Sequence, residues 1–225
     1  MATAITPVIL TCENNLSVTR QFAQSFAHVR SAFKPPVVLI DQSKSPRLSG
    51  DYLSLVASMK PAAVYIHPPE PGISAYDSVQ VAANIALEHG LSHAARDGNL
   101  LFIEDDIVFS SRFAPILTRT RLTLQSGFLT LYLPGNGYGK PVLDPNHFYG
   151  SQCLLFTRKA VEEIVTGRDE MMAKFLPGYD IRWSRFLAHK GYVLHCFKHS
   201  YVQHLPSNSR LHSHGGSHVS NCFVP

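Results

Sequence analysis

Three adjacent carboxylates, Glu104, Asp105 and Asp106, directly follow the apolar residues 100–103 in the segment NLLFIEDDIVF. Like charges repel at this spacing, and a carboxylate beside a buried strand is costly unless a cation lies next to it. Side chains alternate faces along an extended chain, so Glu104 and Asp106 are expected on one face and Asp105 on the other. Two carboxylates on one face suit a divalent cation that keeps open positions for phosphate oxygens. The alternative is a solvated polar turn that leads into the next helix.

The segments before the acids alternate between strand and helix patterns. Residues 7–11 and 36–40 are short apolar runs rich in β-branched side chains, which suits strands covered on both faces. Between them, Ser17 is a candidate N-cap for a helix. The apolar positions of that helix form one stripe, namely Val18, Phe22, Phe26, Val29 and Phe33. Strand, helix and strand in this order predict a βαβ unit.

A second βα pair brings the acids to the edge of the predicted sheet. Residues 62–67 are a predicted strand, and 77–90 are a predicted helix that leads to the acidic strand. In that helix Asp77 and Gln80 form a candidate capping box, and Gly90 is a natural C′ residue. Ligands bind outside the carboxyl ends of strands in open α/β sheets, so the position of the acids favours a binding site over a solvated turn.

The second half of the chain has a less regular pattern. Strands are predicted at 129–134, 151–156 and 192–197, and a turn-rich loop, GNGYGKPVLDPNHFYG, connects the first two. Helices are predicted after Thr157, as an N-cap, and over 181–189. No repeat or linker divides the chain, so we predict a single α/β domain with a mostly parallel sheet between helices.

The composition excludes several classes of protein. Of the 225 residues, 45% are hydrophobic and 16% charged, as in ordinary globular domains, and the net charge of +4 comes without the Lys/Arg run of a nucleic-acid arm. No apolar segment reaches membrane-spanning length and the N-terminus lacks a secretory signal pattern, which predicts a cytoplasmic protein without integral membrane association. The four cysteines are far apart in the sequence, so we expect buried reduced thiols rather than disulfides or a thiolate zinc site.

The order of elements and the segment LLFIEDDIVFSSRF resemble the nucleotide-sugar-dependent glycosyltransferases of the GT-A fold, which is Rossmann-like. In that family an early βαβ half binds the nucleotide, and a strand ends in an Asp-x-Asp motif or a Glu-Asp-Asp variant of it. The segment FYGSQCLLFTRKAVEEIV resembles bacterial lipopolysaccharide-type transferases. The resemblance implies one GT-A domain over residues 1–225, with a nucleotide-sugar-binding half over 1–110 and an acceptor-binding half over 111–225 that ends in a flexible His-rich tail.

The resemblance also implies roles for residues on the donor side. Asp106 would bind a Mn²⁺ or Mg²⁺ ion held against the donor diphosphate, because a departing nucleoside diphosphate carries growing negative charge. Glu104 would lie near the ribose or uracil, and Asp41 near the nucleobase, although a turn residue explains Asp41 equally well. A solvent-facing role explains Asn84 at least as well as donor contact. The remaining donor-side candidates are Thr11 and Asp105.

On the acceptor side, Asp180 resembles the catalytic base of inverting transferases, which deprotonates the acceptor hydroxyl. Asp is also a preferred helix N-cap, which is the competing interpretation. The tryptophan Trp183 could stack on a sugar ring or pack in the core. Four residues are further candidates for sugar contact, namely Tyr149, Gly150, Ser151 and Gln152.

The segment VQHLPSNSR resembles the part of GT-A enzymes that completes the metal site. It implies that His204 is a metal ligand. It also implies phosphate contacts by Ser207, Ser209 and Arg210, since the fork of arginine suits phosphate oxygens. The clustered histidines that follow could bind zinc, but a polar tail is the favoured interpretation.

The resemblance, together with these residues, implies a metal-dependent, inverting glycosyltransferase that moves a sugar from a nucleoside diphosphate sugar, with a UDP-sugar favoured, to an acceptor hydroxyl. A retaining mechanism stays open, because sequence does not fix the anomeric outcome. The alternatives are a nucleotidyltransferase, which normally carries a Gly-rich basic loop where this chain has TCENNLS, and a catalytically silent carbohydrate-binding domain. The expected acceptor is a glycan or another hydroxyl compound, and a nucleic acid such as a modified DNA base is less favoured.

Overall fold

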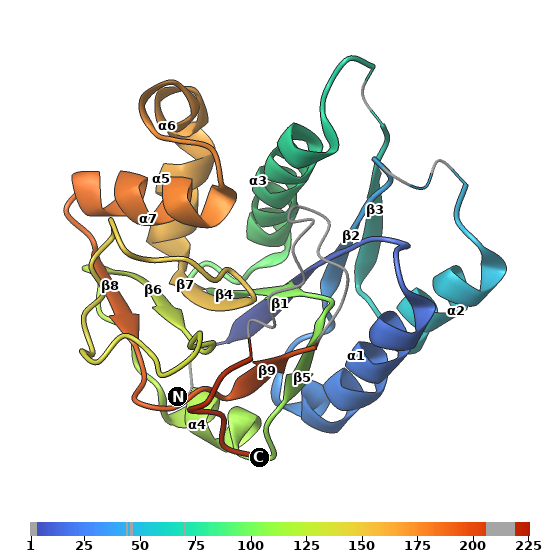
Figure 1. Cartoon of the computed structure of the whole chain (residues 1–225), viewed down its shortest axis with the longest axis horizontal. Helices are drawn as coiled ribbons and strands as arrows, with labels where there is room; N and C mark the ends of the chain where they lie inside the picture. The colour runs from blue at the N-terminus through green and yellow to red at the C-terminus, as the bar shows by residue number, and fades with distance from the viewer. Residues whose placement is uncertain (1–3, 44, 46, 70, 206–218) are drawn as a thin grey trace.

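The computed structural model of the chain describes residues 4–43, 45, 47–69, 71–205 and 219–225. The predicted phosphate contacts Ser207, Ser209 and Arg210 lie outside these residues, as does most of the His-rich tail. In the part of the chain that is described, a central sheet lies between two layers of helices and forms a single domain (Figure 1).

Seven strands of the described chain form the central sheet, in the spatial order β3-β2-β1-β4-β7-β6-β8. Their bounds are β1 (Ile5–Thr11), β2 (Val37–Asp41), β3 (Ala63–His67), β4 (Asn99–Glu104), β6 (Ser126–Thr130), β7 (Cys153–Thr157) and β8 (Val193–Cys196). Neighbours from β3 to β4 are parallel, β7 is antiparallel to β4 and to β6, and β8 is parallel to β6. The mostly parallel sheet predicted from the sequence is thus confirmed.

The four parallel strands end at one edge of the sheet. The register pairs Leu10 with Glu104 and Asp41 with His67, so this edge carries the last residues of all four strands, Thr11 among them. Every residue of β1 and β2 is buried, because helices cover both faces of the sheet. This is why these strands are continuous apolar runs rather than alternating patterns.

Two sets of helices cover the two faces of the sheet. Their bounds are α1 (Leu16–Val29), α2 (Gly50–Ser58), α3 (Ala75–His93), α4 (Phe113–Arg119), α5 (Arg158–Thr166), α6 (Arg168–Lys174) and α7 (Tyr179–His189). The helices α1, α2 and α4 share one apolar cluster with the sheet, and α3, α5, α6 and α7 share the other (Figure 1).

The start of α1 differs from the prediction by two residues. Asn15, rather than Ser17, is the N-cap, and its Oδ1 accepts a hydrogen bond of 3.0 Å from the N–H of Ser17. The predicted stripe is correct through Val29, but Phe33 follows the helix, after the short 3-10 helix η1 (Arg30–Ala32). An Asn at the N-cap satisfies an otherwise orphan N–H, as a Ser would.

Both predicted ends of α3 are wrong. Ser74 is the N-cap: its Oγ accepts the N–H of Asp77 at 3.1 Å and donates to the Asp77 carboxylate at 2.6 Å. Gly90 lies inside the helix rather than after it. A Cβ at Gly90 would come 2.3 Å from Val8 Cγ2 and 3.0 Å from Leu100 Cδ2, so glycine is needed there for close packing of α3 on β1 and β4.

The second half is more irregular, as predicted. Thr157 is confirmed as the N-cap of α5, since its Oγ1 accepts the N–H of Ala160 at 3.2 Å. The strand predicted at 129–134 is shifted, because β6 begins at Ser126 and ends at Thr130. The helix α6 was not predicted, and α7 begins two residues before the predicted 181.

The cysteine prediction agrees with the structure. All four cysteines lie in the described part of the chain and none forms a disulfide; Cys12, Cys153 and Cys196 are buried, and Cys222 is half-buried. No helix within the described ranges has the length and apolar character needed to cross a membrane.

Candidate active site

A small second sheet brings a histidine to the acids at the end of β4. The strand β5 (Ile107–Phe109) starts just after the acids and pairs antiparallel with β9 (Val202–His204), with Ile107 opposite His204. This pairing places His204 Nε2 3.0 Å from Asp106 Oδ2. The backbone supports the same approach, because the N–H of Leu205 donates to the carbonyl of Asp106 at 2.7 Å.

We call Glu104, Asp106 and His204 the acidic rim. Burial alone would lower the pKa of His204, but the hydrogen bond and charge of Asp106 and the charge of Glu104 outweigh it, so the pKa is raised. The other carboxylate oxygen of Asp106, Oδ1, is buried and has no hydrogen-bond partner among the described residues. A buried carboxylate oxygen without a donor is costly, and a bound cation would remove that cost.

Glu104 is held by two hydroxyl groups from the second half of the chain. Ser151 Oγ donates to its Oε1, and the hydroxyl of Tyr179 donates to the same oxygen at 2.6 Å. Burial, followed by the charge of Asp106, raises the pKa of Glu104 to about 7, although both hydroxyl groups and His204 act in the opposite direction. Two carboxylates thus share this buried rim with a single imidazole, and Asp106 Oδ1 lies there without a partner among the described residues.

Asp105 points away from the rim, as the alternation along the strand predicts. Its Oδ2 accepts a hydrogen bond of 2.6 Å from Thr11 Oγ1, and Thr19 Oγ1 of α1 lies 3.5 Å from the same oxygen. Thr11 Oγ1 also lies 2.8 Å from the hydroxyl of Tyr52 in α2. We call these four residues the Thr11 cluster. They tie β1, α1 and α2 to the acidic segment, and the predicted donor contacts of Thr11 and Asp105 stay predictions.

Asp41 is the last residue of β2, the strand next to β1, and lies buried at the same edge of the sheet as Thr11. Its carboxylate accepts from the N–H of Ser43 at 3.0 Å and the hydroxyl of Ser43 at 2.9 Å, which is an Asx turn. Ser78 of α3 lies 3.4 Å from the same carboxylate. The turn interpretation thus has direct support, and a contact with a nucleobase stays a prediction.

Asn84 does not face solvent. It is buried, and its Oδ1 accepts a hydrogen bond of 2.9 Å from the indole N–H of Trp183. Trp183 has no exposed surface and packs edge-on against Phe102 and Phe156, with ring centroids 5.1 and 5.6 Å away. The core interpretation of Trp183 is confirmed, because a buried indole needs an acceptor, which Asn84 supplies.

Asp180 lies in the first turn of α7 and is half-buried, but it is not the N-cap. The N-cap position is Gly178, which has a φ of +111°. Asp180 Oδ2 accepts the N–H of Gly150 at 3.0 Å, and Oδ1 accepts the N–H of Ile181 at 2.9 Å. The neighbouring residue, Tyr179, reaches Glu104, so α7 connects the predicted base to the acidic rim.

Two residues of the acidic rim are suitable ligands for a divalent ion. Among the described residues, no three His, Cys, Asp or Glu side chains converge as a metal cage would require. Asp106 and His204 do converge, and they offer one carboxylate and one imidazole. Ions such as Mg²⁺ are commonly held by one or two protein carboxylates, with substrate phosphates and water completing the shell. The pair fits an ion that is shared with a phosphorylated ligand.

Several residues at the site were missed by sequence reasoning. Tyr179 precedes Asp180 directly, but only its fold position shows that it donates to Glu104. The buried ring of Tyr132 lies 6.3 Å from that of His204, and burial together with the charge of Asp106 raises the pKa of its hydroxyl. Glu13 binds Ser49 at the start of α2. None of these positions has a local sequence pattern that identifies it.

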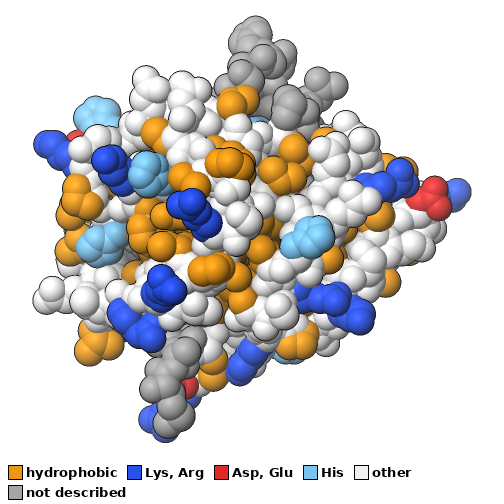
Figure 2. Space-filling view, turned by 90° about the horizontal axis from the view of Figure 1, so that it is seen from below, with side chains coloured by type: hydrophobic (Ala, Val, Ile, Leu, Met, Phe, Trp, Pro, Cys, Tyr) orange, Lys and Arg blue, Asp and Glu red, His pale blue; other side chains and the backbone are white. Residues whose placement is uncertain are grey.

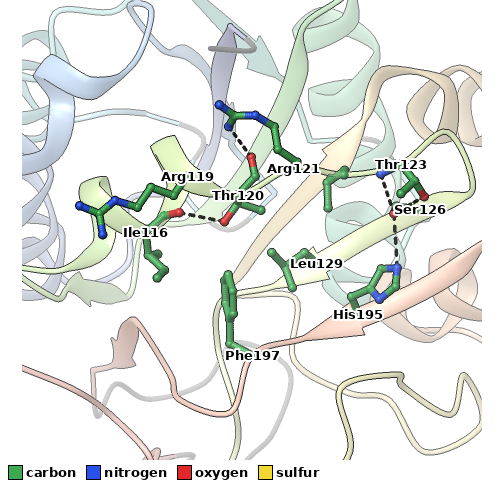
Figure 3. Close-up of a pocket in the computed structure, with 10 residues that line it drawn as sticks. Ile116, Arg119, Thr120, Arg121, Thr123, Ser126, Leu129, His195 and Phe197 are labelled. Atoms are coloured by element: carbon green, nitrogen blue, oxygen red, sulfur yellow. Dashed lines mark hydrogen bonds between the residues drawn. The ribbon is translucent and has the colours of Figure 1, made fainter. Parts of the chain in front are cut away.

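A separate hollow of about 420 Å³ lies beside α4, away from the acidic rim. Ile116, Leu129 and Phe197 contribute apolar side chains to its lining, while Arg121 folds back onto the backbone (Figure 3). Arg121 donates to the carbonyls of Thr118 and Thr120, both at 2.9 Å. Its guanidinium is thus used to complete the end of α4.

Comparison with known proteins identifies the fold. No protein-family model matches the sequence, and no curated protein sequence matches it. The solved structures that resemble it include TarS of S. aureus (residues 1–349), with a TM-score of 0.58 at 12% identity over 91% of this chain. They also include the apo form of the glycosyltransferase GlyE of Streptococcus pneumoniae TIGR4, with a TM-score of 0.50 at 10% identity over 86% of this chain. The chain spans 61% of the TarS chain and 45% of the GlyE chain. This similarity agrees with the predicted GT-A type fold.

Proposed function

We propose that the chain is a metal-dependent glycosyltransferase that moves a sugar from a nucleoside diphosphate sugar to an acceptor hydroxyl. The observation that carries this proposal is the buried Asp106 Oδ1, which lacks a partner among the described residues and lies beside His204 and Glu104. A buried site with two carboxylates and one imidazole, at the carboxyl edge of a parallel sheet, suits a cation that is shared with phosphate. The similarity to a glycosyltransferase fold agrees with this chemistry.

In this proposal Asp106 and His204 hold a Mn²⁺ or Mg²⁺ ion. When bound, the ion neutralises the charge that grows on the departing nucleoside diphosphate. Hydrogen bonds from Ser151 and Tyr179 hold Glu104 in place near Asp106 and His204. The Thr11 cluster holds the acidic segment in place through Asp105. The acids are thus positioned before donor binds, which avoids the cost of ordering them during the reaction.

Asp180 is the proposed base. Both carboxylate oxygens accept backbone N–H groups, and each keeps a lone pair for the acceptor hydroxyl. In an inverting transfer, the acceptor oxygen forms its bond to the anomeric carbon while the bond to the diphosphate oxygen breaks. Asp180 accepts the hydroxyl proton in that step, and the diphosphate leaves with the electron pair.

The donor and acceptor sides follow from the same arrangement. A UDP-sugar is the proposed donor, with Asp41 on the nucleobase side of the sheet edge. The loop of residues 134–150 reaches Asp180 through Gly150, which supports an acceptor site on that side. A glycan or another hydroxyl compound is the proposed acceptor.

A donor-hydrolysis screen tests the proposal. Purified protein is incubated with a panel of nucleoside diphosphate sugars, with and without Mn²⁺, and release of the nucleoside diphosphate is measured. We expect slow hydrolysis of one donor, dependent on metal, and a higher melting temperature only when metal and donor are both present. Absence of hydrolysis and of stabilisation across the panel would contradict the proposal. Pyrophosphate release from a nucleoside triphosphate would replace it with nucleotidyl transfer.

A further inference from the structure

A cavity of about 670 Å³ lies between the glycine-rich start of the 134–150 loop, the segment after β8 and the C-terminal segment. We call it the lysine cavity and define it by Lys140, Lys198, His199, Tyr138, Phe197 and Cys222. None of these residues belongs to the acidic rim. The volume lies within the roughly 300–1,000 Å³ of sites that hold small organic ligands.

Two uncompensated ammonium groups give the lysine cavity its charge. Within the described chain, neither Lys140 nor Lys198 forms an ion pair, and no described acidic side chain lines the cavity. By contrast, Lys174 and Lys190 both lie 2.8 Å from the carboxylate of Glu170. A concave surface with one sign of charge raises the local concentration of ions of the other sign. The lysine cavity therefore favours an anion, and lysine commonly binds phosphate.

The surrounding surface agrees with this preference. The C-terminal segment lies at the lower end of the molecule in Figure 1, together with α4. Figure 2 views the molecule from below and shows Lys, Arg and His side chains around exposed apolar ones, with few acidic side chains. An anionic ligand that approaches this end meets a predominantly positive surface.

The loop wall of the lysine cavity also offers backbone donors. Gly135, Gly137 and Gly139 have φ of +51°, +80° and +70°, and the residues between them do not have positive φ. Alternating signs of φ turn successive N–H groups toward a common side, which is the arrangement of anion-binding nests. Within the described residues, the N–H groups of Tyr138, Gly139 and Lys140 donate to no acceptor.

The remaining walls suit a saccharide. The rings of Tyr138 and Phe197 are half-buried and offer apolar faces against which the C–H groups of a sugar can pack. Asn221 Nδ2 donates to Asn136 Oδ1 at 3.0 Å, so Asn136 keeps its NH₂ group and Asn221 its carbonyl for hydroxyl groups. Cations, apolar rings and amides together match a sugar that carries an anionic group.

Tyr138 connects the lysine cavity to the proposed base. Its hydroxyl donates to the carbonyl of Tyr149, and the N–H of the next residue, Gly150, donates to Asp180 Oδ2 at 3.0 Å. Gly150 has a φ of +119°, and a Cβ there would come 3.1 Å from the ring of Tyr132. The turn between the cavity and the proposed base is therefore tightly packed, and it links Tyr138 in the cavity wall to Asp180.

We propose that the lysine cavity binds the phosphate-bearing part of a saccharide acceptor. Lys140 and Lys198 contact the phosphate, and Tyr138 and Phe197 pack against the sugar ring. This inference rests on the proposed glycosyl transfer, because it names the chemical class of the acceptor as a phosphorylated saccharide rather than a neutral glycan.

Cys222 provides a direct readout of occupancy, because it lines the cavity and is the half-buried cysteine while the other three are buried. The rate of alkylation of Cys222 by iodoacetamide is measured by mass spectrometry on the full chain. We expect mannose 6-phosphate to slow alkylation at least threefold, and mannose or inorganic phosphate at the same concentration to have little effect. No protection by the sugar phosphate would overturn the site. Equal protection by inorganic phosphate would overturn the saccharide assignment.

Two double variants with the same change of charge localise the effect. Lys140→Gln/Lys198→Gln is expected to raise the mannose 6-phosphate concentration that gives half-maximal protection at least tenfold. The control is Lys34→Gln/Lys159→Gln, which removes two exposed lysines that lie outside the cavity and form no ion pair in the described chain. The control is expected to keep wild-type protection, and an equal loss in both variants would overturn a local site in favour of general charge attraction.

Donor hydrolysis separates this inference from the proposed function. Metal-dependent hydrolysis by the wild type and by the Lys34→Gln/Lys159→Gln control tests glycosyl transfer without using the cavity. Hydrolysis without protection of Cys222 would overturn the cavity assignment alone. Protection of Cys222 without any donor hydrolysis would contradict the proposed function and, with it, the assignment of the ligand as an acceptor.

Discussion

Asp105 and Asp106 are neighbours in the sequence, yet they belong to regions of the molecule with opposite hydrogen-bonding states. Asp105 belongs to the Thr11 cluster, where a threonine hydroxyl donates to it at 2.6 Å. Asp106 belongs to the acidic rim, where one oxygen faces His204 and the other is buried without a partner among the described residues. One step along the bend between β4 and β5 separates a satisfied carboxylate from one with an unpartnered oxygen.

This difference indicates separate roles for the two regions: the Thr11 cluster stabilises the fold, and the acidic rim serves the proposed reaction. Hydrogen bonds to a carboxylate stabilise the fold when every partner is in place, whereas a buried oxygen without a donor destabilises it. The fold tolerates the second arrangement at the edge of the sheet where ligands bind. We therefore expect substitutions in the Thr11 cluster to lower stability, and substitutions in the acidic rim to lower activity.

The largest expected effect is at Asp106. Asp106→Asn keeps the shape of the side chain but removes the charge that would hold the ion, so metal-dependent donor hydrolysis should fall about 10²–10³-fold. Its melting temperature should fall less than that of Asp105→Asn, because the loss of the ion pair with His204 is offset by the relief of repulsion with Glu104. Asp105→Asn should lower the melting temperature. The comparison fails if Asp106→Asn is the less stable of the two by differential scanning calorimetry.

The Thr11 cluster is probed by Thr11→Val, which preserves shape and removes the hydroxyl. The free energy of unfolding should fall by about 1.5–3 kcal/mol, the usual range for a hydrogen bond to a charged group. Urea denaturation measures this change. A loss below about 0.5 kcal/mol would mean that this cluster does not have the structural role assigned to it.

The packing of α3 against the strands β1 and β4 is probed at Gly90. Gly90→Ala places a Cβ 2.3 Å from Val8 Cγ2, and overpacking of this kind typically costs about 1–3 kcal/mol. Gly50→Ala is the matched control, because it also lies in a helix and its Cβ meets nothing within 4 Å. Equal melting temperatures for the two variants would contradict the close packing of α3 on β1.

The smallest effect is expected at Glu170, a surface carboxylate that belongs to neither region. Hydrogen bonds from Lys174 and then Lys190 lower the pKa of Glu170 from 4.5 to about 2. Because the folded pKa is the lower one, the stabilisation is present above pH 4.5 and is lost as the pH falls toward 2. Glu170→Gln should lower the melting temperature slightly at pH 7 and not at pH 2. A difference that is independent of pH would exclude this cause.

Local patterns were sufficient for the elements that surround the acids. Continuous apolar runs predicted β1, β2 and β4, and the alternation of side chains separated Asp105 from its two neighbours. Errors arose where packing overrides a local rule. Gly90 fits a helix end by type, but its position depends on Val8 of a distant strand.

The site itself needed contacts that a local pattern does not contain. His204 reaches Asp106 across 98 positions through the pairing of β5 with β9, and only the resemblance to a family pointed to it. Tyr179 reaches Glu104 across 75 positions, and Asn84 is buried because of Trp183, 99 positions away. Such partners depend on tertiary structure rather than on spacing.

The most direct test of the central claim is the position of manganese in a crystal of the protein soaked with Mn²⁺ and a nucleoside diphosphate. We predict an anomalous peak about 2.1 Å from a carboxylate oxygen of Asp106, with His204 and the diphosphate in the same coordination shell. A well-ordered diphosphate with no anomalous peak at Asp106 would contradict the claim that this carboxylate holds the ion.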